Sequence, residues 1–176
     1  MNTPRPDRDA NPFLAPVGDR DPTRRLRGRL VAPVTIITAG AGDQQSGLTV
    51  SSLLVAEGEP PIVYFLVGSA TDLFYAIDES DKFVVHVCEG RHRELADVFA
   101  GLRPSPGGMF AGQSVTQTAH GPRLDDIPTR AYCSVLALRE ESYSVINSAE
   151  IDGVGIADLD DPLAFFRGRY RGLASP

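Results

Sequence analysis

Short runs of β-branched and aromatic residues, separated by glycine, proline and aspartate, recur along this chain and constrain its fold more than any other feature. Val34–Thr38, Ile62–Val67 and Phe83–Cys88 are too short for ordinary helices and carry side chains that favour a pleated strand. The other expected strands are Leu48–Val55, Ala131–Leu138, Ser144–Ile151 and Ala164–Tyr170. We therefore predict a mainly β fold with short helices, whose sheet closes into a barrel and so hides its edges.

Two stretches of helical periodicity interrupt these strands. Ser69–Ile77 begins with Ser69, a good N-cap residue, and places Asp72 near the positive end of the helix. Arg91–Ala100 has apolar residues on one side and is followed by Gly101, a typical C-cap. Both segments predict short amphipathic helices that pack against the sheet.

Length and composition predict one folded domain with a flexible arm. The 176 residues are 42% hydrophobic, which is enough for a single core. Residues 1–23 are rich in proline and charge, so we expect an arm there and a single domain over residues 24–176. A short helix is expected over Arg24–Leu30, and Leu102–Pro122 is interpreted as a long surface excursion because it is rich in glycine, proline and hydroxyl residues.

The same composition argues against several function classes. The net charge of −6 is unlike that of a nucleic-acid-binding protein, so no nucleic acid is expected. No apolar run approaches the roughly 18–20 residues of a membrane span, and the N-terminus lacks the apolar core of a signal peptide, so we expect a cytoplasmic protein without membrane contact. Cys88 and Cys133 favour buried reduced thiols. The three histidines lack metal-ligand spacing, and His86 is interpreted as a packing residue.

Hydroxyl side chains gather at two places beside apolar strands. Thr49, Val50, Ser51 and Ser52 could line a planar polar ligand, or they could form a polar exterior face. Ser69 and Thr71 at a helix start could hold a phosphate, or Ser69 could be a simple N-cap. If both clusters bind one ligand, it has a flat polar ring and a phosphate tail, as flavin mononucleotide (FMN) has.

Arginines alternate near the C-terminus. In a continuous strand, Arg167, Arg169 and Arg171 would share one face, with Tyr170 on the other. Such arginines could pair with cofactor phosphates, or they could form a solvated edge that resists aggregation.

An ordered series of motifs resembles the flavin reductase-like, FMN-binding split-barrel family. It includes "PVTIITA", "GLTVSSLLVAEGEPPIVYFLV", "SATDLFYAI", "DKFVVHV", "RHRELADVFAG" and "PLAFFRGRYRGL". The likeness extends from about Leu26 to Leu173. It implies a homodimeric split barrel of Greek-key type, with FMN or in some members FAD at the subunit interface.

The resemblance also implies an activity and a set of site residues. Members typically transfer hydride from NADH or NADPH to flavin, and some supply reduced flavin to a monooxygenase partner. By position, Thr49, Val50, Ser51 and Ser52 would line the flavin, and Ser69 and Thr71 would hold its phosphate. Phe99 and the Arg167–Tyr170 region would lie near the flavin or the partner subunit.

One departure from the family pattern concerns the nucleotide site. Many members carry a histidine linked with nicotinamide binding, and here the matching stretch "ESYSV" places Tyr143 at that position. Tyr143 is thus a candidate for the nicotinamide site, since a tyrosine can stack on a ring. The swap leaves an alternative open, a flavin-binding module without reductase activity of its own.

Overall fold

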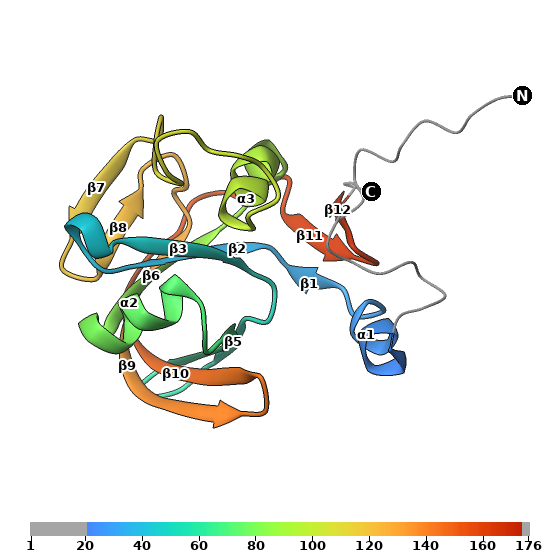
Figure 1. The fold of residues 1–176 in the computed structure, drawn as a ribbon, viewed down its shortest axis with the longest axis horizontal. Coiled ribbons are helices and arrows are strands. Elements are labelled where there is room, and N and C mark those ends of the chain that lie inside the picture. The colour runs from blue at the N-terminus through green and yellow to red at the C-terminus, as the bar shows by residue number, and fades with distance from the viewer. Residues whose placement is uncertain (1–20, 174–176) are drawn as a thin grey trace, which may run out of the picture.

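A seven-stranded antiparallel sheet dominates the computed structural model, which describes residues 21–173 (Figure 1). In sheet order its strands are β3 (Ser46–Val50), β2 (Thr35–Ala39), β6 (Lys82–Val87), β9 (Arg130–Glu141), β10 (Ser144–Gly155), β5 (Ile62–Gly68) and β4 (Leu54–Ala56). The sheet curls so strongly that its β3 end reaches β5. Just after β3, the Ser52 hydroxyl accepts a hydrogen bond from the Leu66 N–H at 3.0 Å and lies 3.2 Å from the Leu66 carbonyl.

Smaller elements surround this sheet. A three-stranded sheet contains β1 (Ala32–Pro33), β11 (Leu163–Phe166) and β12 (Arg169–Gly172), and a separate hairpin contains β7 (Val115–Thr118) and β8 (Gly121–Leu124). The helices are α1 (Pro22–Arg27), α2 (Asp72–Ser80) and α3 (Arg93–Phe99), with the short 3-10 turns η2 (Gly42–Gln44) and η3 (Gly90–His92). Figure 1 shows α1 beside β1, at the opposite side of the molecule from the β7–β8 hairpin. No helix among residues 21–173 is long and apolar enough to cross a membrane.

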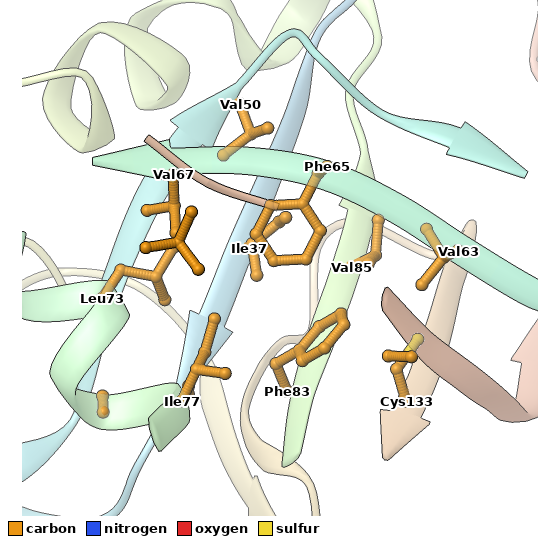
Figure 2. Close-up of a cluster of buried hydrophobic side chains, with 14 residues drawn as sticks. Ile37, Val50, Val63, Phe65, Val67, Leu73, Ile77, Phe83, Val85 and Cys133 are labelled. Atoms are coloured by element: carbon orange, nitrogen blue, oxygen red, sulfur yellow. The ribbon is translucent and has the colours of Figure 1, made fainter. Parts of the chain in front are cut away.

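The main core fills the inside of the curled sheet, and α2 covers one side of it. Figure 2 shows Val67, Leu73 and Ile77 pointing toward the apolar side chains of the central strands. Phe65 and Phe83 meet edge to face, with ring centroids 5.2 Å apart. Leu73 and Ile77 thus lie on the buried face of α2, which confirms the short amphipathic helix predicted from the sequence.

A second cluster packs α3 against the outside of β2 and β3. Gly47 lies so close to Phe99 that an added Cβ would come 2.5 Å from the ring, so glycine is required by this approach. Leu124 and Ile127 are buried in the same cluster. The β3 strand is thus held between two apolar layers, which fixes where its C-terminal end emerges.

Both cysteines are buried and free, which confirms the sequence expectation. Burial raises the pKa of the Cys88 thiol to about 12 and that of the Cys133 thiol to about 12. These thiols act as small apolar packing groups.

The start of α2 differs from the sequence prediction. Thr71, rather than Ser69, is the N-cap: its hydroxyl accepts a hydrogen bond from the Phe74 N–H at 3.2 Å. The Thr71 N–H donates to the Gly68 carbonyl at 3.2 Å, so the chain turns before the helix begins. Ser69 and Thr71 are both good caps in isolation, and this turn selects the second.

Three other element predictions needed correction. The expected strand Leu48–Val55 is split, because the chain leaves β3 after Val50 and crosses to β5 before β4 starts. The excursion Leu102–Pro122 contains β7 and the start of β8. These strands were not predicted because their residues are mostly polar, glycine or proline. The expected strand Ala164–Tyr170 is a hairpin, with Arg167 in its turn; Arg167 therefore does not share a strand face with Arg169 and Arg171.

The N-terminal prediction falls mostly outside the described residues. Residues 1–20 of the expected arm are not described, and Asp21 caps α1. The short helix expected over Arg24–Leu30 begins slightly earlier, at Pro22, and ends at Arg27 before Gly28.

His86 is a fully buried packing residue, as the sequence indicated. Its Nδ1 lies 3.0 Å from the Ile36 carbonyl, and its Nε2 accepts a hydrogen bond from the Leu124 N–H at 3.0 Å. This pairing suits the neutral ring with the proton on Nδ1. Burial lowers the pKa of His86 from 6.5 to about 4.

Acidification is expected to destabilise the protein through His86. Because its pKa is lower in the folded chain, the unfolded chain binds a proton first as the pH falls below 6.5. At about 1.4 kcal/mol per pKa unit, about 3 kcal/mol of unfolding free energy is lost by about pH 4. Urea unfolding at a series of pH values between about 7 and 4.5 measures this loss.

His86→Gln isolates the contribution of this side chain, since other groups also titrate in that range. The variant should be less stable than the natural protein near neutral pH, and its stability should depend less steeply on pH. An equally steep dependence in His86→Gln would show that other groups cause the acid sensitivity.

Candidate functional site

A pocket of about 730 Å³ opens where β3 and β5 end. One wall is the segment Leu48–Ser52, and another is Leu66–Gly68 with Ser144 at the start of β10. The remaining walls come from α1 with the residues after it and from the β11–β12 turn, through Arg24, Arg27, Gly28, Leu30, Ala32, Phe165, Arg167 and Gly168. Five segments that are distant in sequence therefore meet around one hollow.

The predicted row Thr49, Val50, Ser51 and Ser52 lines this pocket as one continuous segment. Two of its hydroxyls are already engaged with the protein. Thr49 donates to the Ala96 carbonyl of α3 at 2.7 Å, and Ser52 is hydrogen-bonded to the main chain of β5. Ser51 makes no hydrogen bond with the described residues, so its hydroxyl remains available to a ligand.

The predicted phosphate residues lie beside the pocket rather than on its lining. Gly68 lines the pocket, and the Thr71 hydroxyl donates to the Gly68 carbonyl at 2.9 Å while it caps α2. Ser69 is exposed between them. The pocket lining thus ends at Gly68, three residues before the N-cap of α2, whose N-terminal end carries positive partial charge.

Arginine is the only charged residue type on the pocket wall formed by the described residues. Arg24, Arg27 and Arg167 line it, and none of its described lining residues is acidic. This contrasts with the whole chain, whose net charge is −6. A local cluster of guanidinium groups favours an anionic ligand, and phosphate oxygens match its planar donors.

The remaining predicted site residues lie elsewhere. Phe99 is buried in the second core cluster, where it contacts Phe110 edge to face at 5.3 Å. Tyr170 is half-buried on β12, and Arg93 lies over its ring at 5.7 Å; burial and then the nearby Asp97 raise the pKa of Tyr170. Tyr143 is 92% exposed at the tip of the β9–β10 hairpin, next to the pocket residue Ser144.

Sequence reasoning missed Arg24 and Arg27. The signal was present as the basic run "RRLRGRL", which was considered only as a helix. Placing the run at the pocket required knowing that the Arg167 N–H donates to the Gly28 carbonyl at 3.1 Å, since this bond joins α1 to the β11–β12 turn. No group of three or more possible metal ligands occurs in the described part of the chain.

Comparison with known proteins gives a consistent set of relatives. The family model described as Flavin reductase like domain matches residues 27–174. FMN reductase (NADH) RutF of Ancylobacter novellus is 24% identical over 160 residues, which are 91% of this chain and 88% of that protein. The reductase component of 4-nitrophenol 4-monooxygenase/4-nitrocatechol 2-monooxygenase of Rhodococcus opacus is 28% identical over 153 residues, or 86% of this chain and 80% of that protein.

A solved structure with the same fold is that of NADH:FAD oxidoreductase SgcE6 from Streptomyces globisporus C-1027, in complex with NAD and FAD fragments. It superposes with a TM-score of 0.79 at 24% identity and covers 92% of this chain and 96% of that chain. The predicted fold, a mainly β split barrel with short helices, is confirmed by this likeness.

Ser52→Ala is expected to lower the free energy of unfolding by about 1–2 kcal/mol, because it removes the side-chain contacts that join the β3 end to β5. Ser51→Ala is the matched control: it deletes the same atom one residue away and should change stability by less than about 0.5 kcal/mol. Urea unfolding of both variants measures the difference. Equal losses would mean that the Ser52 contacts do not hold the sheet together.

Proposed function

This chain belongs to the flavin reductase like domain family, and from that membership we propose that it transfers hydride from NADH or NADPH to a flavin. The observation that carries the proposal is the pocket between β3 and β5, which combines a free hydroxyl with guanidinium groups and an apolar wall. The family assignment confirms the resemblance noted in the sequence. The residues present fit a planar ring with a phosphorylated chain.

Different parts of the pocket suit different parts of such a ligand. Leu48 and Leu66 offer apolar surface to a flat ring, and the Ser51 hydroxyl can donate to a ring heteroatom. Ser69 and Thr71 remain candidates for binding the phosphate, together with the main-chain N–H groups at the start of α2. When bound, the flavin accepts the hydride, while the protein binds and orients the reactants.

The choice of flavin and of nucleotide is part of the proposal. We propose FMN as the flavin, with FAD as the alternative ligand, and NADH or NADPH as the co-substrate. Tyr143 is proposed to stack on the nicotinamide when a second subunit or the nucleotide itself covers the exposed hairpin tip. Phe99 supports the site from the core by packing beneath β3 at Gly47.

We also propose that two copies of the chain assemble around the pocket. Leu54 on β4 is 69% exposed and pairs across the sheet with Tyr64, and Leu66 on the same strand as Tyr64 is 46% exposed. These three side chains form an apolar patch that reaches the pocket through Leu66. Exposed apolar patches often mark interfaces, and two-fold dimers are the commonest soluble oligomers.

A monooxygenase is the proposed recipient of the reduced flavin. The relative from Rhodococcus opacus is described as the reductase component of a monooxygenase, and it aligns with most of this chain. The open pocket of about 730 Å³ suits a flavin that enters and leaves rather than one that is permanently enclosed.

The purified protein is expected to oxidise NADH or NADPH only when FMN or FAD is present. Loss of absorbance of the reduced nucleotide, measured with each of the four combinations, tests this and identifies the preferred pair. Ser51→Ala should raise the KM for flavin about two- to tenfold, because one hydrogen bond contributes about 0.5–1.5 kcal/mol. Its fold should be unchanged.

Two results would contradict this proposal in different ways. No nucleotide oxidation, together with tight FMN binding, would favour a flavin-binding module without reductase activity. Unaltered kinetics in Ser51→Ala would mean that the ring does not lie against this segment.

Leu54→Glu is expected to separate the two copies, because it places a charge in the apolar patch. Analytical ultracentrifugation should give twice the chain mass of 18.9 kDa for the natural protein and the single mass for the variant. Ile156→Glu is the control, since Ile156 is 82% exposed and lies outside the patch. A monomeric natural protein would rule out the second copy.

A further inference from the structure

Three arginines from two separate elements meet at the α1 end of the pocket. Arg24 and Arg27 are three residues apart on α1, so they lie on one helix face, and Arg167 comes from the β11–β12 turn. None of them forms an ion pair with a carboxylate among residues 21–173. Asp21, the N-cap of α1, accepts a hydrogen bond from the Thr23 N–H at 2.6 Å, and this bond first, then the charge of Arg24, lowers the Asp21 pKa, although the two charges form no ion pair. The cluster therefore holds positive charge that the described protein does not neutralise by ion pairing.

The backbone at Arg167 is unusual for this residue type. Arg167 and Gly168 have φ values of 52° and 79° and form a two-residue hairpin turn between β11 and β12. Turns of this kind favour asparagine or glycine at the first position, because other side chains are disfavoured at positive φ. An arginine at such a strained position points to a function for its side chain.

The turn and α1 are held together as one unit. The Arg167 N–H donates to the carbonyl of Gly28, the residue that caps α1. The β11–β12 hairpin also pairs with β1, which follows α1 directly. These contacts fix the base of each arginine, so the three guanidinium groups can converge on one ligand with a smaller loss of freedom than on a mobile loop.

The pocket thus favours negative charge at two places. One is the base of α2 beside Gly68, where a single phosphate is proposed to bind, and the other is the arginine cluster on the α1 side. A mononucleotide has one phosphate group and needs only one such place. A larger flavin or a second nucleotide would use both.

We propose that Arg24, Arg27 and Arg167 bind the pyrophosphate of a dinucleotide, and that they set how strongly this protein prefers dinucleotides to mononucleotides. The inference rests on the proposed function, since FAD and the nicotinamide nucleotides both carry this group. Guanidinium forks bind phosphate oxygens in bidentate fashion, and two linked phosphates offer enough oxygens for several forks.

ADP-ribose is the direct probe, because it carries the pyrophosphate but neither a flavin nor a nicotinamide ring. Isothermal titration with the full-length protein should show ADP-ribose binding that weakens as salt is raised. The double variant Arg24→Gln/Arg27→Gln should weaken it at least about tenfold, and so should Arg167→Asn, which suits the positive φ of the turn. FMN affinity should fall clearly less than ADP-ribose affinity in both.

Two matched controls test whether loss of any arginine has the same effect. Arg25 lies on α1 between the two pocket arginines, and Arg171 lies on β12; both are exposed and neither lines the pocket. Arg25→Gln and Arg171→Gln should bind ADP-ribose as the natural protein does. Circular dichroism of all variants checks that they fold.

Two further measurements identify which dinucleotide, FAD or the nicotinamide nucleotide, carries the pyrophosphate that the cluster binds. If the cluster binds FAD, the pocket variants lose FAD affinity while the KM for NADH with FMN is unchanged. If it binds the nicotinamide nucleotide, that KM rises about tenfold while FAD affinity stays the same. Both changes together also support the proposal and mean that the two dinucleotides share the cluster.

Other results would overturn the proposal. It fails if the natural protein does not bind ADP-ribose, or if the pocket variants bind it unchanged. It also fails if FMN affinity falls as much as that for ADP-ribose, since the arginines would then serve the single phosphate. If the natural protein reduces flavin but its pocket variants bind ADP-ribose as tightly as it does, only this inference is rejected. If ADP-ribose binding depends on the arginines but the protein does not reduce flavin, only the proposed function is rejected.

Discussion

The contact between the Ser52 hydroxyl and the main chain of Leu66 fixes the segment that links β3 to β4, and two walls of the pocket depend on it. It lies just ahead of the β4–β5 pairing, which begins where Leu54 meets Tyr64, and so extends that attachment toward the end of β3. With it, Leu48–Ser52 and Leu66–Gly68 become two walls at a fixed separation. The bond from Thr49 to Ala96 anchors the first wall to α3 in the same way. The residues nearest the hollow thus also hold the architecture together.

Much of the fold could be predicted from the sequence because its strands carry strong local signals. The β-branched run at Val34–Thr38 and the apolar run at Ile62–Val67 appear as β2 and β5 with small shifts. The break after Val50 could not be predicted, since Thr-Val-Ser-Ser is a good strand sequence and only the path to β5 interrupts it. The turn at Arg167 was missed for a related reason, because arginine gives no local signal for positive φ.

The site shows the same division between local and tertiary information. Hydroxyl residues beside an apolar strand indicated a ligand-binding segment, and Thr49–Ser52 does line the pocket. The contribution of α1 to the pocket depends on the main-chain hydrogen bond between Arg167 and Gly28. This bond joins two segments that are more than a hundred residues apart. An acidic chain with a basic pocket also illustrates that overall charge describes the surface average, whereas recognition depends on where the few cations are placed.

The two buried cysteines restrict how electrons can pass through this protein. A thiol reacts as its anion, and groups with such high proton affinity hardly ionise at physiological pH. Both sulfurs are buried in the core and neither lines the pocket, so neither is placed to relay reducing equivalents to it. The proposed hydride transfer therefore runs between the bound nucleotide and flavin, without a thiol of this chain as an intermediate.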